Sequence, residues 1–313
     1  MAGRVISFAR LLLRRVTLLV TLLACVFVAV DLLPGNTARA VLGREATPEQ
    51  IAAKERELGL DRPLAVRFSD WIAGVATGDF GRTARGRPVN DLLVDKFPPT
   101  LLLGGLALAV TVLASLALGA WWTTRPDGAA ARVLQPTTTT AVAIPEFVIS
   151  TVLILVFALA LGWLPAVTIT GRSGFPAGPE MLVLPVLALA LPQIGWNTRV
   201  VRAALADAAR APHVESAVLD GLSGRVVLTR HVLPFALPTI VASFATTVGM
   251  LLGGALVVET IFNYPGLGAV LAGSVADRDT SVVAAVVALS GVVIMAMLAV
   301  ADGIRSWSLR GRR

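Results

Sequence analysis

The stretch Val214–Pro238 reads V-E-S-A-V-L-D-G-L-S-G-R-V-V-L-T-R-H-V-L-P-F-A-L-P and lies between two apolar runs. Residues 214–219 predict a short helix with small residues on one side. Gly221 predicts the end of that helix, because glycine accepts the left-handed conformation that terminates helices. Pro234 and Pro238 then mark the entry to the next apolar run. A short helix held between membrane spans is suited to docking in another protein's groove, and a solvated loop is the alternative.

The spacing inside this stretch is regular. Glu215-Ser216-Ala217 is followed after three residues by Gly221, and after nine more by His231-Val232-Leu233-Pro234. This resembles the cytoplasmic coupling loop of ABC importer permeases, whose pattern is E-A-A, three residues, G, nine residues, I-x-L-P. Ser216 replaces the first Ala, and His231 replaces the Ile, as in the peptide and nickel branch of the family. The resemblance implies an ATPase-coupling loop formed by Glu215, Ser216, Ala217, Gly221, His231, Leu233 and Pro234.

The composition indicates a membrane protein. Of 313 residues, 56% are hydrophobic and 15% are charged, against about 45–50% and about 25% in soluble domains. The net charge of +7 raises nucleic-acid binding as an alternative. The arginines cluster at the ends of apolar runs rather than on one polar domain, which argues against it. The single cysteine, Cys25, leaves no intramolecular disulfide and no cysteine metal site.

Six apolar runs are each long enough to cross ~30 Å of hydrocarbon as a helix. They are residues 16–33, 100–122, 136–164, 181–197, 235–258 and 281–304. The first run follows basic residues, so a signal peptide is the alternative, but its length and the later runs favour a retained helix. The small residues Gly249, Gly253, Gly254 and Ala255 in the fifth run predict close helix packing.

These runs predict a domain organisation. Residues 1–33 form an N-terminal tail and the first transmembrane helix, and 34–99 form an external loop in which Thr47-Pro48-Glu49 begins a helix that stops at Gly59. Residues 100–313 form a five-helix core with a cytoplasmic coupling loop at 199–234. Excluding the long first loop, the segments placed inside hold 15 basic residues and the two short external loops hold two. This bias predicts that both termini are cytoplasmic.

The chain lacks the residues of an energy-converting enzyme. A phosphate-binding G-x-x-x-x-G-K-[ST] loop is absent, because Lys54 follows Ala and Lys96 follows Asp. ATP is therefore expected to be hydrolysed by another subunit. H-E-x-x-H is also absent, so we expect no metal site, no cofactor and no catalytic residue in this chain.

Four acidic residues lie inside apolar runs or directly at the end of one, where charge is costly and often functional. Asp31, Glu259 and Asp302 lie near the ends of runs, where snorkelling or a helix-end contact is the simpler account. Glu146 follows Pro145 inside the third run. It predicts a side chain that faces a translocation path or a helix–helix contact, and a buried hydrogen-bonded acid is the alternative.

Further segments resemble the peptide-type permeases. They are L-G-L-D-R-P at 58–63, G-D-F-G-R-T at 78–83 and E-T-I-F-N-Y-P-G-L-G at 259–268; Leu33-Pro34-Gly35 also fits, with Asn36 where the family usually has Asp. The resemblance implies an all-α integral membrane protein of type I ABC importer permease architecture. It also implies candidate pathway or gate residues at Glu146, Glu259, Pro265 and Gly266.

The function implied is that of a permease subunit of an ATP-driven importer for dipeptides, oligopeptides or nickel complexes. It would lie in the bacterial cytoplasmic membrane and work by alternating access. The partners implied are a second similar permease, two cytoplasmic ATPases that bind ATP and Mg, an external substrate-binding protein and membrane lipid, with no nucleic acid. A secondary transporter is disfavoured, because it predicts paired intramembrane charges and a repeat. A non-transporting scaffold remains an alternative.

Overall fold

A computed structural model describes residues 2–43, 45–124 and 128–310. The described chain is almost entirely helical and separates into two compact units. The first unit is Met1–Pro98 with Gly266–Val293, and the second unit is Pro99–Pro265 with Ile294–Arg313.

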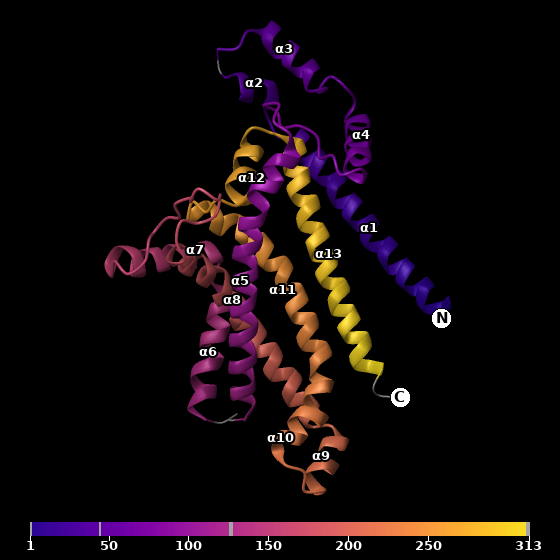
Figure 1. The fold of residues 1–313 in the computed structure, drawn as a ribbon, viewed down its shortest axis with the longest axis vertical. Coiled ribbons are helices and arrows are strands. Elements are labelled where there is room, and N and C mark those ends of the chain that lie inside the picture. The colour runs from indigo at the N-terminus through magenta and orange to yellow at the C-terminus, as the bar shows by residue number, and fades with distance from the viewer. Residues whose placement is uncertain (1, 44, 125–127, 311–313) are drawn as a thin grey trace. The chain divides into compact units, whose positions relative to one another are not determined.

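The described helices are α1 (Ala2–Asp31), α2 (Thr37–Leu42), α3 (Pro48–Glu57), α4 (Leu64–Ala76), α5 (Val89–Thr124), α6 (Ala129–Ala143), α7 (Glu146–Leu153), α8 (Glu180–Ala209), α9 (Pro212–Leu219), α10 (Gly224–Val226), α11 (Leu233–Ile261), α12 (Leu267–Ala276) and α13 (Thr280–Arg310) (Figure 1). Two π-helical segments, η1 (Ile154–Ala160) and η2 (Val227–Val232), follow α7 and α10. Five helical segments are long and apolar enough to cross a membrane, and the bent pair α6 and α7–η1 adds a sixth if it is one span. The predicted all-α membrane fold is confirmed in this form.

The third predicted span is not one straight helix. Its two halves are bent by 107° at a break of two residues, Ile144 and Pro145. Pro145 has no N–H to donate into the preceding turn, and its ring forces residue 144 out of the helical region. Ile144 has φ −91° and ψ 122°, which is extended backbone. The third predicted span is therefore a sharply bent pair of helices.

In the first unit, α4 packs against α1 through aromatic side chains. Phe27 lies 5.1 Å from Phe68 and 5.2 Å from Trp71 between ring centroids, and Arg67 Nη1 lies 3.0 Å from Asp31 Oδ1. Asp31 therefore makes a helix-end contact, one of the two simpler accounts given above.

Other local predictions in the first unit are also confirmed. The helix predicted after Thr47 is α3, with the Thr47 and Gln50 side chains capping its first turn, and Gly59 follows it at φ +66°.

Asp279 accepts hydrogen bonds from Ala84 N at 2.6 Å and Val282 N at 3.3 Å, and the second of these caps α13. Burial raises the pKa of the Asp279 carboxyl.

The second unit is built around α8 and α11, which pack along one another with α5, α6 and α7 against them. Its main apolar core combines buried residues of four helices: Leu103, Ala107, Leu153, Leu184, Leu189, Leu251, Ala255 and Val258. Two glycines allow α5 and α6 to approach α8 closely. A Cβ at Gly119 would lie 2.6 Å from Val201 Cγ1, and one at Gly195 would lie 2.8 Å from the backbone oxygen of Thr138. These helices therefore have no room for a side chain at either position.

The glycines predicted to mediate packing in α11 behave differently from one another. A Cβ at Gly254 would lie 3.2 Å from Leu189 Cδ2, whereas one at Gly253 would meet nothing within 4 Å. Close packing is therefore confirmed at Gly254, while the chain's own helices leave space at Gly253.

A buried polar cluster joins α8 to α11. Asn197 Nδ2 donates to Gln193 O and to Thr247 Oγ1, both at 2.8 Å, and Ser243 Oγ donates to Asn197 Oδ1 at 2.7 Å. Asn197 and Thr247 are completely buried. Hydrogen bonds between apolar spans fix the register of the helices, because an unpaired polar group there is costly.

Candidate functional site

The segment 212–234 connects α8 to α11 at one end of both helices (Figure 1). Pro212 occupies the first turn of α9, where its missing N–H costs nothing. The helix ends at Leu219, and Gly221 follows at φ +74°, with its N–H donating to Val218 O at 3.0 Å. The short helix and its glycine stop, both predicted from the sequence, are confirmed.

One face of α9 is buried against α8. Val214 and Ala217 are 4% and 3% exposed, and they belong to a cluster with Val201, Ala204, Leu205, Val227, Val232, Ala236 and Ile240. This cluster joins α9 to α8, η2 and α11. A displacement of α9 would therefore be transmitted to the two helices at the centre of the second unit.

The end of α9 and the turn that follows it are exposed and largely apolar. Val218, Leu219 and Leu222 are 58%, 81% and 41% exposed, and they lie beside the exposed acids Glu215 and Asp220. We call these five residues the outer face of α9. Exposed apolar residues rimmed by charge are typical of an interaction surface.

The sequence motif did not identify Val218, Leu219 and Leu222. For Leu219 the signal was present in the helical periodicity. Val214 and Ala217 are three residues apart and share a face, and Leu219, five residues after Val214, points away from that face.

The predicted coupling residues have different environments. Glu215 and Ser216 are exposed, and Ala217 is buried. Leu233 is 38% exposed at the start of α11, and Pro234 lies in the first turn of that helix.

Two histidines tie the ends of the segment together. His213 Nε2 lies 3.0 Å from the backbone oxygen of His231, at hydrogen-bond distance. The His213 ring also stacks on Phe235, with 4.2 Å between ring centroids. Residues 18 apart in the chain are thus held in contact, which restricts the movement of α9 relative to α11.

Glu146 begins α7, directly after the bend at Pro145. A Cβ at Gly254 would lie 3.4 Å from Glu146 Oε1, so the carboxylate packs against α11. Glu146 is half-buried. Of the two accounts open from the sequence, this geometry fits a side chain that faces a translocation path or a helix–helix contact better than a fully buried acid.

Glu259 is completely buried in the last turn of α11, which differs from a side chain that snorkels to the interface. Nearby, the Tyr264 hydroxyl donates to the backbone oxygen of Pro99 at 2.8 Å. Burial raises the pKa of Tyr264, and the charge of Glu259 raises it further. The remaining gate candidates, Pro265 and Gly266, are buried, and Gly266 is the residue before α12.

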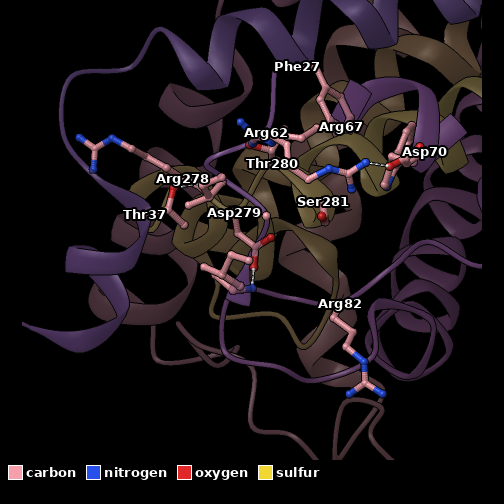
Figure 2. Close-up of a pocket in the computed structure, with 15 residues that line it drawn as sticks. Phe27, Thr37, Arg62, Arg67, Asp70, Arg82, Arg278, Asp279, Thr280 and Ser281 are labelled. Carbon is pink, nitrogen blue, oxygen red and sulfur yellow. Dashed lines mark hydrogen bonds and ion pairs between the residues drawn. The ribbon is translucent and has the colours of Figure 1, made fainter. Parts of the chain in front are cut away.

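The first unit contains a polar cavity of about 200 Å³ between α1, α4 and the start of α13. Arg62 on its wall pairs with Asp70 at 2.7 Å. Figure 2 shows the Arg82 and Arg278 side chains extending away from one another. These arginines therefore do not converge on one ligand. Within the described residues, no group of three His, Cys, Asp or Glu side chains is placed to hold a metal ion.

Two family models match the sequence. Residues 115–313 match the family described as binding-protein-dependent transport system inner membrane component, and residues 7–104 match the N-terminal membrane component of such systems. Together these matches cover nearly the whole chain.

Characterised relatives and solved structures point the same way. The chain is 36% identical over 269 residues to the glutathione transport system permease protein GsiC of Salmonella typhimurium (strain LT2), covering 84% of each chain. It is 35% identical, with the same coverage, to GsiC of Escherichia coli (strain K12). Its fold is similar to a chain of the MetNI methionine ABC transporter in an inward-facing conformation, with a TM-score of 0.56, 18% identity, and coverage of 69% of this chain and 96% of that one. An amino acid ABC transporter crystallised with histidines gives a TM-score of 0.51 at 18% identity, with coverage of 66% and 89%.

Proposed function

This chain belongs to the family of inner membrane components of binding-protein-dependent transport systems, the permeases of ABC importers, and from that premise we propose that it forms half of a peptide translocation pathway. It is a multi-pass protein of the bacterial inner membrane, and it is not the subunit that hydrolyses ATP. As a permease of this class it works with an ATPase and a substrate-binding protein.

Peptides are the substrate class that the relatives favour. The GsiC proteins are named for transport of glutathione, which is a small peptide. The segments at 58–63, 78–83 and 259–268 also resemble the peptide-type permeases. We therefore assign dipeptides or oligopeptides to this chain.

Coupling to ATP hydrolysis is assigned to the outer face of α9. The observation that carries this assignment is Leu219, which is 81% exposed on a helix whose opposite face is buried against α8. A groove on a cytoplasmic ATPase that accepts Leu219 would gain its apolar area, and Glu215 would set the orientation. When ATP binding closes the ATPase pair, α9 would move and carry α8 and α11 with it through Val214 and Ala217.

The proposed assembly has two permeases, this chain and a second similar one, with two ATPases that hold ATP and Mg. The bias of basic residues supports a cytoplasmic position for both termini and for the coupling loop at 199–234. The loop at 34–99 would then be external and face the substrate-binding protein, and residues 100–313 would form the five-helix core.

Glu146, Glu259, Pro265 and Gly266 are proposed to line or gate the pathway. Glu146 is the one with a direct test, because its carboxylate lies beside α11 at a break between helices. Glu146→Gln is expected to reduce uptake of basic peptides more than uptake of neutral ones. Glu180→Gln, at the exposed start of α8, is the matched control. Equal losses for both peptide classes would leave Glu146 with a packing role.

The docking proposal is tested by purification of the full-length chain from mild-detergent membranes and identification of the proteins bound to it. Recovery of an ATPase is expected, with loss of that ATPase from Leu219→Asp. Leu42→Asp is the matched control, since Leu42 is an exposed leucine of α2, outside the candidate spans.

Two outcomes would contradict the proposal. Undiminished ATPase recovery with Leu219→Asp would remove the outer face of α9 as the docking surface. Absence of any ATPase, under conditions that keep a known ABC importer intact, would favour a non-transporting scaffold.

A further inference from the structure

A second cavity lies within the second unit, between the end of α5, the middle of α6 and the last third of α8. Its volume is about 440 Å³, and its lining residues are Trp122, Gln135, Thr139, Trp196, Arg199, Val200, Arg202 and Ala203. The volume falls within the range of small-molecule sites, about 300–1,000 Å³. Among the described residues, the lining combines two arginines and two tryptophans and contains no acid.

The two arginines of this cavity are not neutralised by the described part of the chain. Within residues 2–43, 45–124 and 128–310, neither Arg199 nor Arg202 forms an ion pair. The guanidinium carbon of Arg202 instead lies 4.3 Å from the centroid of the Trp122 ring. An aromatic face orients the guanidinium but leaves its N–H groups available to an anion.

Trp122 provides a second, independent observation. Its side chain is only 3% exposed, and its Nε1–H has no hydrogen-bond partner among the described residues. A buried indole N–H is normally paired, because leaving it unpaired costs free energy. This tryptophan on the wall of the cavity therefore supplies a donor without an acceptor. An occupant with several acceptor oxygens would complement it and both arginines.

The position of the cavity along the helices indicates its depth in a membrane. α8 has 30 residues and is therefore about 45 Å long, against about 30 Å of hydrocarbon. Arg199 and Arg202 lie about 19 and 22 residues after the first residue of α8, where such a helix leaves the hydrocarbon. Trp121 and Trp196, which are 42% and 43% exposed, lie at the same end, as expected for aromatic residues at an interface.

From these observations we propose that the cavity binds the phosphate group of an anionic membrane phospholipid. Arg199 and Arg202 donate to the phosphate oxygens, and Trp196 and Val200 contact the first carbons of the acyl chains. Basic pockets between transmembrane helices at this depth suit such headgroups. The site goes beyond the transport function. A lipid bound there would contact the part of α8 directly before Ala204 and Leu205, and these two residues pack with α9 in one apolar cluster.

The experiment uses the full-length chain purified in a neutral detergent and titrated with phosphatidylglycerol, with bound lipid counted by native mass spectrometry. Saturable binding is expected, with phosphatidylcholine binding more weakly. Arg199→Gln with Arg202→Gln is expected to weaken phosphatidylglycerol binding about 30-fold, since each arginine near an anionic surface contributes about five-fold. Arg199→Gln alone leaves the contact with Trp122 in place and is expected to weaken binding about five-fold.

Arg225→Gln with Arg230→Gln is the matched control, because it removes two exposed arginines from the same end of α8 and α11. Binding within two-fold of the parent chain is expected for this control, about the scatter of such titrations. Unchanged phosphatidylglycerol binding in the Arg199 and Arg202 variants would overturn the site. Complete displacement of the lipid by millimolar inorganic phosphate would also overturn the proposal, because it would identify a site for a soluble anion.

Discussion

The contact between α8 and α11 and the outer face of α9 belong to the same unit, but they use their residues in opposite ways. Between α8 and α11, the buried Asn197 is paired within the chain, with Thr247 and Ser243. On α9, apolar groups are exposed, with Leu219 at 81%. The hydrogen bonds of Asn197 are made within the chain, whereas the outer face of α9 leaves apolar area exposed for another molecule to cover.

This difference separates stability from coupling. Substitutions in the contact between α8 and its neighbours should lower the free energy of unfolding of the chain. Substitutions on the outer face of α9 should leave that free energy almost unchanged and alter ATP-driven uptake. The predictions below are ordered by their expected effect on the free energy of unfolding, from the largest to the smallest.

Gly195→Val is expected to have the largest effect. A Cβ at Gly195 would lie 2.8 Å from the backbone oxygen of Thr138, and backbone in a packed helix cannot move aside easily. We expect a loss of about 3 kcal/mol, measured by denaturant unfolding of the chain in detergent. Gly253→Val is the matched control, because a Cβ there meets nothing within 4 Å. A loss of similar size in both variants would show that the contact of α6 with α8 is not tightly packed.

Asn197→Leu is expected to cost about 1–2 kcal/mol in the same measurement. The change removes the acceptor of Ser243 and the donor to Thr247, and leaves both hydroxyls between apolar spans. Thr246→Val serves as the control, because Thr246 is exposed and its hydroxyl donates to Ser243 O in its own helix. If Asn197→Leu is as stable as the parent chain, the polar cluster does not hold α8 to α11.

The sequence predicted the features that depend on neighbouring residues. The coupling motif, the helix of α9 and its end at Gly221 all follow from local spacing and from the conformations that glycine accepts. The resemblance to ABC importer permeases is confirmed by the family matches. Six apolar runs gave the spans because length and hydropathy are also local properties.

The features that the sequence did not predict depend on residues far apart in the chain. Asn197 meets Thr247, 50 residues later, and Gly195 meets Thr138, 57 residues earlier by their numbers. No local pattern distinguishes these positions from other small or polar residues in a span. The 107° bend has a cause in the sequence, Pro145. Pro185 and Pro192, however, lie within α8 without ending it, so a proline by itself does not predict where a helix breaks.

Gly221→Ala is expected to cost about 1 kcal/mol, because φ is +74° there and a Cβ disfavours the left-handed region. The loss should be local. Amide exchange in α9 should become about five-fold faster, while exchange in α8 stays the same. Gly224→Ala, at the helical start of α10, is the control, and it should be neutral or slightly stabilising. Equal exchange rates in α9 for both variants would mean that the turn at Gly221 does not hold the helix in place.

Val218→Asn is expected to have the smallest effect on unfolding, within about 0.5 kcal/mol, because Val218 is 58% exposed and is not one of the buried residues of the α9 cluster. If an ATPase covers the outer face, the same change removes apolar area from that interface. The affinity for the ATPase should then fall about five- to ten-fold, with a matching loss of uptake at limiting ATPase. Val94→Asn is the control, since Val94 is 73% exposed near the start of α5. Stability lost together with uptake would indicate that this face is packed within the chain. If stability and uptake are both retained, the ATPase docks elsewhere. Uptake lost with stability retained is the result that only an interface completed by another subunit gives, because the folded chain by itself does not use the Val218 side chain.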